Sequence, residues 1–535
     1  MFDEKKRKQL AGPGEEARCD VVVIGAGALG CAIARELSRY ELKTVVLEKN
    51  ADVAGETTGR NSAVVHAGFN NRQGSLMARF CVEGNEGFEE VCEELDVPYR
   101  RTGKLVVAFD AEARQSLEGL LSQGLANGCR GLEILEGERL ETLLKERGME
   151  DEENRFKAAL WSPRTAITNP FLYCVALAEN ALANGADFYL DTKVTGITPA
   201  EGEGARFTIT TENTRSGQDG PVFSCRYLIN CAGLMADRIA AMAGMPADTY
   251  RIYPCRGEYF ILDRKATREE DLLSMPIYPA PQKKIGGLGV HLTPTIEGNI
   301  IIGPSAEYLD DADSHTDETD SRTDYACTQP VMEKLMREAV QLMPAVKEVQ
   351  PIGNYAGIRP KQAPPGEGGY HDYVIQAEEE VPGLIDLIGI ESPGLTASLP
   401  IARYVCRMIG QMEEECGAGL KQKADFCGSR QGILRFREQT LKRQAELIQQ
   451  DPAYGEIICR CQKITRREIC QAIENPLGAV SIAAIKYRAW ATTGRCNGGY
   501  CLPRIVRILK EDYGIPPEEI RYRNKGSEMF TGKVK

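Results

Sequence analysis

The sequence predicts an α/β chain with more than one domain: a doubly wound parallel-sheet domain, an inserted α+β lobe built on an antiparallel sheet, and a small, mostly helical C-terminal module. Three observations support this. An apolar strand near the N-terminus runs into glycines at G-x-G-x-x-G spacing, strand-like runs with Pro-rich loops fill residues 250–345, and two cysteine pairs lie near the end of the chain. At 535 residues, the chain is long enough for several hydrophobic cores.

The first predicted unit begins with residues 21–24, an apolar run that suits a strand buried on both faces. Gly25, Gly27 and Gly30 follow it. Gly25 permits a tight turn, Gly27 leaves space for a pyrophosphate, and Gly30 allows the next helix to pack close to the strand. This spacing predicts a phosphate-binding turn.

The helix that follows opens at Ala28 and Leu29, with its free N–H groups directed at the phosphates. A second strand, residues 44–47, ends at Glu48, 18 residues after Gly30. A carboxylate there can accept hydrogen bonds from a ribose diol. Strand, glycines, helix, strand and acid in this order predict a Rossmann-type dinucleotide site, and favour it strongly over a glycine-rich turn without a ligand.

The rest of the body reads as loops and elements around this unit. Residues 55–68 are polar and glycine-rich, which suits a loop that wraps a large polar cofactor. Asn169 and Pro170 predict a capped helix start, and Ser392 is the expected N-cap of a later helix. Further strands are expected near Val194, at 207–211 and at 384–389, and residues 227–233 predict a buried strand that ends in a turn of small residues.

Composition excludes several classes of protein. The net charge of −12 argues against general binding of nucleic acid or anionic membranes, and no apolar run reaches the roughly 18 residues of a membrane span. Residues 1–17 are charged and lack an apolar core, which predicts a flexible tail and not a secretory signal. The 18 cysteines without such a signal favour a reducing cytoplasm, with some thiolates holding metal.

These signals divide the chain into four parts. Residues 18–410 form the nucleotide-binding body, with cofactor-binding parts at about 18–100, 150–250 and 350–410 and a substrate-facing lobe at about 100–150 and 250–350. Residues 411–451 are polar and predict a linker, and residues 452–525 form the separate module.

Several motifs in residues 18–410 resemble one family of flavoproteins. Asn61-Ser62, His66-Ala-Gly68, Arg256-Gly-Glu-Tyr259, Gly357-Ile-Arg-Pro360 and 392–398 are similar to the FAD-dependent family that includes D-amino acid oxidase, glycine oxidase, glycerol-3-phosphate dehydrogenase and L-2-hydroxyglutarate dehydrogenase. The resemblance implies FAD as cofactor. The implied FAD-binding residues are Gly25, Gly27, Ala28, Leu29, Gly30, Glu48, Lys49, Thr57, Thr58, Arg60, Asn61, Ser62, Val194, Ala232, Gly233, Gly357, Arg359, Gly394, Leu395 and Thr396.

Candidate catalytic residues follow from the same motifs. His66 and His291 are the candidate bases for a hydroxyl proton, and the sequence does not choose between them. Arg359 matches the arginine that binds the substrate anion in the family, and a guanidinium can grip a carboxylate or phosphate with two hydrogen bonds. Arg256 is a second candidate, with a salt bridge at the surface or between domains as an equal alternative.

The C-terminal module carries Cys459 and Cys461 and, after 34 intervening residues, Cys496 and Cys501. Four thiolates are the usual ligands of a 2Fe–2S cluster, although zinc takes the same set. The pattern resembles the ferredoxin-like module named after bacterioferritin-associated ferredoxin, which favours iron–sulfur. Glycines near the second pair would let backbone N–H groups approach the sulfurs. Cys470 lies outside the pattern and is expected in the core.

The combined resemblance implies a dehydrogenase that oxidises the secondary alcohol of a small anion and gives its electrons to a partner. Sn-glycerol 3-phosphate ranks first, because the anaerobic dehydrogenase for that substrate carries the same module. L-2-hydroxyglutarate follows, and an amino acid or amine is third. The expected partner is an NAD-linked flavoprotein or a membrane-attached iron–sulfur subunit. A different class is an electron-relay subunit without its own substrate.

Overall fold

The computed structural model describes residues 12, 14–149, 155–200, 204–263, 273–281, 289–309, 321–367 and 369–532. Its centre is a six-stranded sheet of order β10–β3–β2–β15–β23–β22, parallel except for the last pair. The strands are β2 (Val21–Ile24), β3 (Thr44–Leu47), β10 (Asp187–Tyr189), β15 (Tyr227–Asn230), β22 (Val374–Ala377) and β23 (Leu384–Ile388). The predicted α/β class and parallel sheet are confirmed.

Both faces of this sheet are covered, which explains the unbroken apolar run of β2. Val21 and Val23 pack against helices, whereas Val22 and Ile24 pack against a second, five-stranded sheet. The helices are α1 (Ala28–Leu37), α2 (Leu76–Glu94), α5 (Pro170–Ala183) and α8 (Gly394–Glu415). The second sheet contains β1 (Glu16–Arg18), β11 (Thr192–Pro199), β12 (Phe207–Asn213), β13 (Gln218–Asp219) and β14 (Val222–Cys225). Helix α6 (Ala236–Met242) follows β15.

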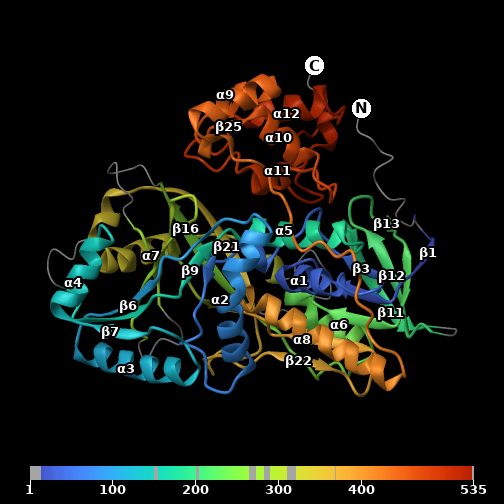
Figure 1. The fold of residues 1–535 in the computed structure, drawn as a ribbon, viewed down its shortest axis with the longest axis horizontal. Coiled ribbons are helices and arrows are strands. Elements are labelled where there is room, and N and C mark those ends of the chain that lie inside the picture. Colours follow the sequence, from blue (N-terminus) through green and yellow to red (C-terminus); the bar gives the residue numbers. More distant parts are fainter. Residues whose placement is uncertain are drawn as a thin grey trace.

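The lobe is a nine-stranded sheet, at one end of the molecule in Figure 1. Its strands are β6 (Lys104–Ala108), β7 (Glu133–Leu135), β8 (Ala158–Ser162), β16 (Tyr253–Leu262), β17 (Ile277–Pro279), β18 (His291–Pro294), β19 (Ile300–Gly303), β20 (Glu307–Tyr308) and β21 (Pro351–Lys361), with α3 (Ala111–Ala126), α4 (Gly137–Glu146) and α7 (Gln329–Leu342). All pairs are antiparallel except β6–β17. The predicted lobe boundaries were too narrow, because β8 pairs with β6 and β21 pairs with β16.

A three-stranded sheet of β4 (Val64–Val65), β9 (Ala166–Thr168) and β5 (Tyr99–Arg100) joins the lobe to the central domain.

Two predicted helix starts have different outcomes. The Asn169 side chain caps α5, as predicted, by accepting from the Leu172 N–H. The predicted Ser392 cap is wrong, because α8 begins at Gly394 with Pro393 at its N-cap and no side-chain cap.

The C-terminal module contains β24 (Ile457–Cys459), β25 (Ile464–Thr465), α10 (Arg466–Ile473), α11 (Ile482–Ala489) and α12 (Leu502–Glu511) around its own core. The predicted linker 411–451 is only partly irregular. Helix α8 continues to Glu415, and α9 (Leu441–Gln450) packs on the module through Leu447 and Tyr454. Leu447 is buried in a small cluster with Phe436 and Tyr454, which anchors this part of the linker.

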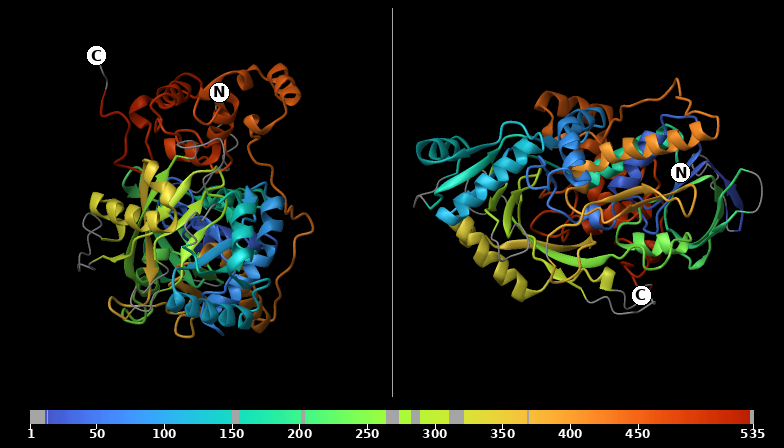
Figure 2. Two further views of the ribbon diagram at one scale, coloured as in Figure 1. Left: turned by 90° about the vertical axis from the view of Figure 1, so that its left-hand side faces the viewer. Right: turned by 90° about the horizontal axis from the view of Figure 1, so that it is seen from below.

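The module sits on the central domain with α11 facing α5 (Figures 1 and 2). The Phe171 and Tyr487 rings stack with centroids 3.7 Å apart. Arg488 donates to both carboxylate oxygens of Asp52 at 2.5 and 2.9 Å, and its side chain is almost fully buried. A buried, bidentate ion pair of this kind has a defined geometry, so it orients the module on the domain.

Two further predictions concern the N-terminal tail and membrane-spanning helices. The predicted tail lies outside the described residues for 1–11 and 13, but Glu16 and Ala17 belong to β1 and pair with β14. Among the described residues, no helix combines the length and the hydropathy that a bilayer span requires.

Candidate functional site

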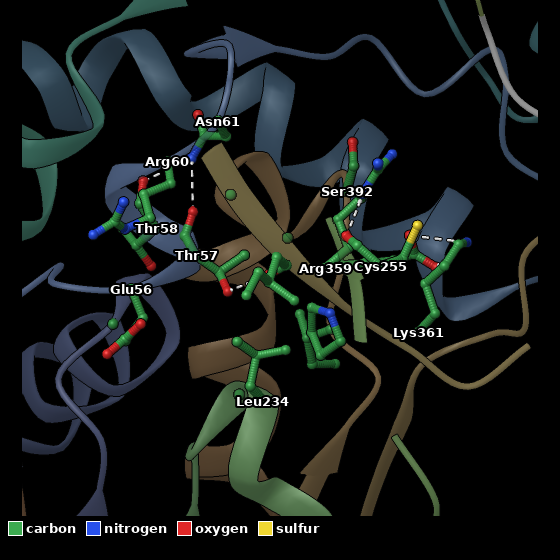
Figure 3. Close-up of a pocket in the computed structure, with 18 of the residues that line it drawn as sticks. Glu56, Thr57, Thr58, Arg60, Asn61, Leu234, Cys255, Arg359, Lys361 and Ser392 are labelled. Carbon is green, nitrogen blue, oxygen red and sulfur yellow. Dashed lines mark hydrogen bonds and ion pairs between the residues drawn. The ribbon is translucent and has the colours of Figure 1, made fainter. Parts of the chain in front are cut away.

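A cavity of about 1220 Å³ runs from the β2–α1 turn to the lobe sheet. Figure 3 shows Thr57, Thr58 and Asn61 on one side of it and Arg359 and Lys361 on another. All predicted cofactor-binding residues line this cavity except Gly30 and Thr396. Gly30 packs helix α1 against the strand before it, and Thr396 accepts a hydrogen bond from the His66 N–H.

The glycine turn is built as the spacing predicts. Gly25 has a φ of +101°, and a Cβ there would lie 2.6 Å from the Cys231 carbonyl oxygen. A Cβ on Gly30 would lie 1.9 Å from the Gly25 carbonyl oxygen, so Gly30 serves helix packing and does not reach the cavity. The start of α1 is therefore open to a ligand, although the Ala28 N–H already donates to Thr58 Oγ1 at 2.9 Å.

Glu48 directly follows β3 beside this turn and is buried, which raises the pKa of its carboxyl group. It accepts from the Ala26 N–H at 2.8 Å, the Asn50 N–H at 2.9 Å and Asn50 Nδ2 at 2.7 Å. A carboxylate offers about four acceptor positions, so one remains for a ribose hydroxyl. The chain thus holds Glu48 in place for the predicted role.

The C-terminal tail also reaches this end of the cavity, which the sequence did not indicate. Asn524 and Lys525 line it. Asn524 Oδ1 accepts from the Ala51 N–H at 3.1 Å, and its Nδ2 donates to Asn50 Oδ1 at 2.7 Å. The tail therefore closes over the loop that positions Glu48.

Two histidines line the opposite end. The His291 ring stacks on Tyr278 at 3.9 Å, and its Nδ1 lies 3.2 Å from the Gly289 carbonyl oxygen. A carbonyl can only accept, so Nδ1 carries the proton and Nε2 keeps a lone pair in the neutral ring. His66 Nε2 lies 3.5 Å from Ser392 Oγ, and its backbone N–H donates to Thr396 Oγ1 at 3.0 Å, which is the contact that Thr396 makes instead of lining the cavity.

Burial keeps both rings neutral. It lowers the pKa of His291 to about 3 and that of His66 well below its usual value, and the nearby Lys104 charge adds to both shifts. A neutral imidazole can accept a proton, but the lowered pKa makes each ring a weaker base than a free imidazole.

Of the two arginines predicted in the site, one lines the cavity and the other does not. Arg359 on β21 lines the cavity and donates from Nη2 to the Ser305 carbonyl at 2.7 Å. Arg256 does not line it, and pairs instead with Asp324 at 2.5 Å and Glu307 at 2.7 Å. Its predicted place in the site is therefore wrong, because side chains alternate across β16 and Arg256 lies on the other face from Cys255, which does line the cavity.

Lys104 is a cation that the sequence analysis missed. It is 2% exposed, and its Nζ lies 4.3 Å from the Tyr278 ring centroid and 4.5 Å from that of Phe69. Burial lowers its pKa to about 7. The available signal was a single lysine in the otherwise apolar strand 104–108. Lys361 lines the cavity and pairs with Glu391 at 3.1 Å.

The four cysteines of the module lie together in two pairs. Cys461 Sγ is 3.5 Å from Cys496 Sγ, and Cys459 is hydrogen-bonded with Cys501. That bond, together with backbone N–H groups of the module, lowers the pKa of Cys459 to about 6. No three His, Cys, Asp or Glu side chains in the described parts of the chain form a group for a single ion.

The surroundings of the thiols fit a cluster. A Cβ on Gly494 would lie 2.3 Å from Cys461 Cβ and 3.1 Å from its Sγ, so the absence of a side chain lets the backbone approach this thiol. Cys461 and Cys496 are exposed, whereas Cys459 and Cys501 are buried. Two adjacent thiol pairs suit a centre with two irons, each of which takes two protein ligands. Cys470 is half-buried beside Tyr513 and apart from the pairs.

Comparison with known proteins agrees with both sites. Residues 20–408 match the family model of FAD dependent oxidoreductases, and residues 457–511 match that of the BFD-like [2Fe-2S] binding domain. A glycerol 3-phosphate dehydrogenase of Caloramator mitchellensis is 36% identical over 96% of this chain and 99% of its own length. An L-2-hydroxyglutarate dehydrogenase of Arabidopsis thaliana is 33% identical over 72% of this chain and 83% of its own length.

Among solved structures, the FAD-bound L-alpha-glycerophosphate oxidase of Mycoplasma pneumoniae has a TM-score of 0.65 and 26% identity, covering 77% of this chain and 98% of that one. FAD and a 2Fe–2S cluster are thus the cofactors of this chain. From the glycine turn, the cavity, the paired thiols and these matches, the chain belongs to the FAD-dependent oxidoreductase family, with a BFD-like 2Fe–2S domain at its C-terminal end.

Proposed function

We propose that this enzyme oxidises the secondary alcohol of sn-glycerol 3-phosphate to dihydroxyacetone phosphate and passes the electrons to a partner protein. The observation that carries the proposal is the similarity to the Caloramator mitchellensis glycerol 3-phosphate dehydrogenase, which extends over 96% of the chain and so includes both the oxidoreductase body and the cysteine module. The L-2-hydroxyglutarate dehydrogenase described above matches 72% of the chain.

The cavity offers the groups that this reaction needs. Bound FAD supplies the hydride acceptor. Arg359 binds the phosphate through the N–H groups that the Ser305 carbonyl leaves unused. Lys104, buried near the histidines but not part of the cavity lining, adds positive charge there when it is protonated. The hydroxyl proton passes to one of the two neutral imidazoles, His66 or His291.

L-2-hydroxyglutarate is the second candidate substrate. It also places a secondary alcohol beside an anionic group, so Arg359 and the histidine pair would serve it in the same way. Sequence identity of 33% to the Arabidopsis thaliana dehydrogenase for this substrate favours it specifically. The two anions differ in shape and in their anionic groups, a phosphate in one and two carboxylates in the other, and direct comparison separates them.

The test is anaerobic bleaching of the flavin absorbance with glycerol 3-phosphate, L-2-hydroxyglutarate, lactate and proline as a panel. We expect glycerol 3-phosphate to bleach the flavin fastest at low concentration. Faster bleaching by L-2-hydroxyglutarate would transfer the assignment to that substrate. If no member bleaches the flavin but a reduced partner protein does, the chain is an electron-relay subunit and the proposal is wrong.

A further inference from the structure

The cysteine module carries charge of the opposite sign to the rest of the chain. The whole sequence has a net charge of −12, yet residues 475–510 contain six Lys or Arg and no Asp or Glu. This stretch includes α11, α12 and the loop with Cys496 and Cys501. Such a concentration of one sign creates a local positive potential on an otherwise acidic protein.

Two arginines of the module, one in this stretch and one before it, are held beside the thiols by an aromatic ring. The Arg460 guanidinium lies 4.1 Å from the centroid of the Tyr500 ring, and that of Arg504 lies 3.6 Å from the same centroid. Arg504 Nη1 also donates to the Tyr500 carbonyl at 2.7 Å. Arg460 adjoins Cys461, and Tyr500 adjoins Cys501, so the ring and its two cations border the cysteine cluster.

These charges have no acidic partner in the part of the chain that the structure describes. Arg460, Lys463 and Arg504 form no ion pair there, and we call them the basic collar. On the neighbouring helix the pattern differs, since Arg466 pairs with Asp512 and Arg467 pairs with Asp451 and Glu474. The arginines of this helix are thus neutralised within the module, whereas the collar is uncompensated.

The collar lies beside the part of the site that is open to solvent. Cys461 and Cys496 are exposed, as are Arg460 and Lys463. The same loop contacts the lobe, where Asn497 Nδ2 donates to the Ile352 carbonyl at 3.0 Å. One side of the loop therefore contacts the lobe, and the side with the exposed cysteines is accessible to a second protein.

We propose that the basic collar is the docking site of an acidic one-electron carrier protein. The proposal extends the proposed function, since oxidation of a secondary alcohol releases two electrons and two protons, and two carriers are each reduced by one electron per turnover. Electron-transfer partners form small and transient complexes, in which complementary charge mainly accelerates association. Positive charge around an exposed redox site therefore selects carriers with an acidic surface.

The experiment uses the full-length protein with both cofactors, with soluble cytochrome b5 as an acidic probe and cytochrome c as a basic one. Binding of each probe to the oxidised protein is measured directly, without turnover, at low salt and at about 1 M salt, where the Debye length is roughly 3 Å. The test variant is Arg460→Gln with Arg504→Gln. The control is Arg130→Gln with Arg139→Gln, which removes the same charge from exposed lobe residues.

We expect cytochrome b5 to bind the wild type and the control equally at low salt, and the test variant about tenfold more weakly, because two attractions across roughly 6 Å of water are lost. At high salt the difference should disappear, and cytochrome c should bind weakly throughout. Iron content and anaerobic bleaching by glycerol 3-phosphate should be unchanged in the test variant.

Several results would overturn the proposal. Equal losses in test and control variants would show a general charge effect, and tight binding of cytochrome c would remove the preference for acidic carriers. A shift in cluster potential without a change in binding would make the collar a tuning device. Binding to phosphatidylglycerol vesicles but not to cytochrome b5 would assign it to a membrane. If no substrate bleaches the flavin while salt-sensitive binding persists, the substrate assignment fails and the docking site stands.

Discussion

Replacement of Arg359 by Met tests the anion site most directly. Arg359 Nη2 donates to the Ser305 carbonyl at 2.7 Å and Nε lies 3.4 Å from the Cys255 carbonyl. Nη1 has no acceptor among the described residues, which leaves its N–H groups for a substrate anion. A hydrogen bond to a charged group contributes about 1.5–3 kcal/mol. At about 1.4 kcal/mol per factor of ten, its loss should raise KM roughly 10- to 150-fold.

The assay measures flavin reduction under anaerobic conditions over a range of glycerol 3-phosphate concentrations, together with flavin content. Met keeps much of the apolar length of the side chain, so flavin content should not change. Arg256→Met is the matched control, because it removes the same group from the facing strand but outside the cavity. We expect its KM to stay close to that of the wild type.

The reasoning is refuted if Arg359→Met leaves KM within about twofold of the wild type, since even the weakest charged hydrogen bond considered is worth about tenfold. An equal rise in KM for both variants would also refute it, because the effect would then come from the β16–β21 pair and not from a contact with substrate.

Three other predictions concern the remaining groups. His66→Asn and His291→Asn should each retain flavin, and the one that removes the base should slow flavin reduction about 100-fold or more in stopped-flow traces. Burial lowers the pKa of Lys104 from 10.5 to about 7, so the unfolded chain binds more protons than the folded one between these pH values. The Tm of the wild type relative to that of Lys104→Met should therefore rise from pH 7 to 10. A difference in Tm that does not change with pH would contradict this. Cys459→Ser should lose iron but keep flavin, whereas Cys470→Ser should keep both in metal and absorbance analyses.

Local sequence patterns were sufficient to predict the parts of the fold that are built from residues close together in the chain. The glycine turn, Glu48 and the first helix lie within one β–α–β unit, so their spacing alone predicts their arrangement. The thiol pairs could also be found from spacing and resemblance, since their ligand chemistry restricts which residues take part. The capped start of α5 at Asn169 follows from the same local logic.

The sequence by itself therefore determined the nucleotide-binding turn, the layered fold and the cysteine site. Only the tertiary structure decided which cations reach the cavity. Side chains alternate along any strand, but the pairing of β16 with β21 decides that Arg359 faces inward and Arg256 outward. The meeting of Lys104 with the histidines and of Asn524 with the Glu48 loop likewise joins segments far apart in the chain, and no local pattern encodes such contacts.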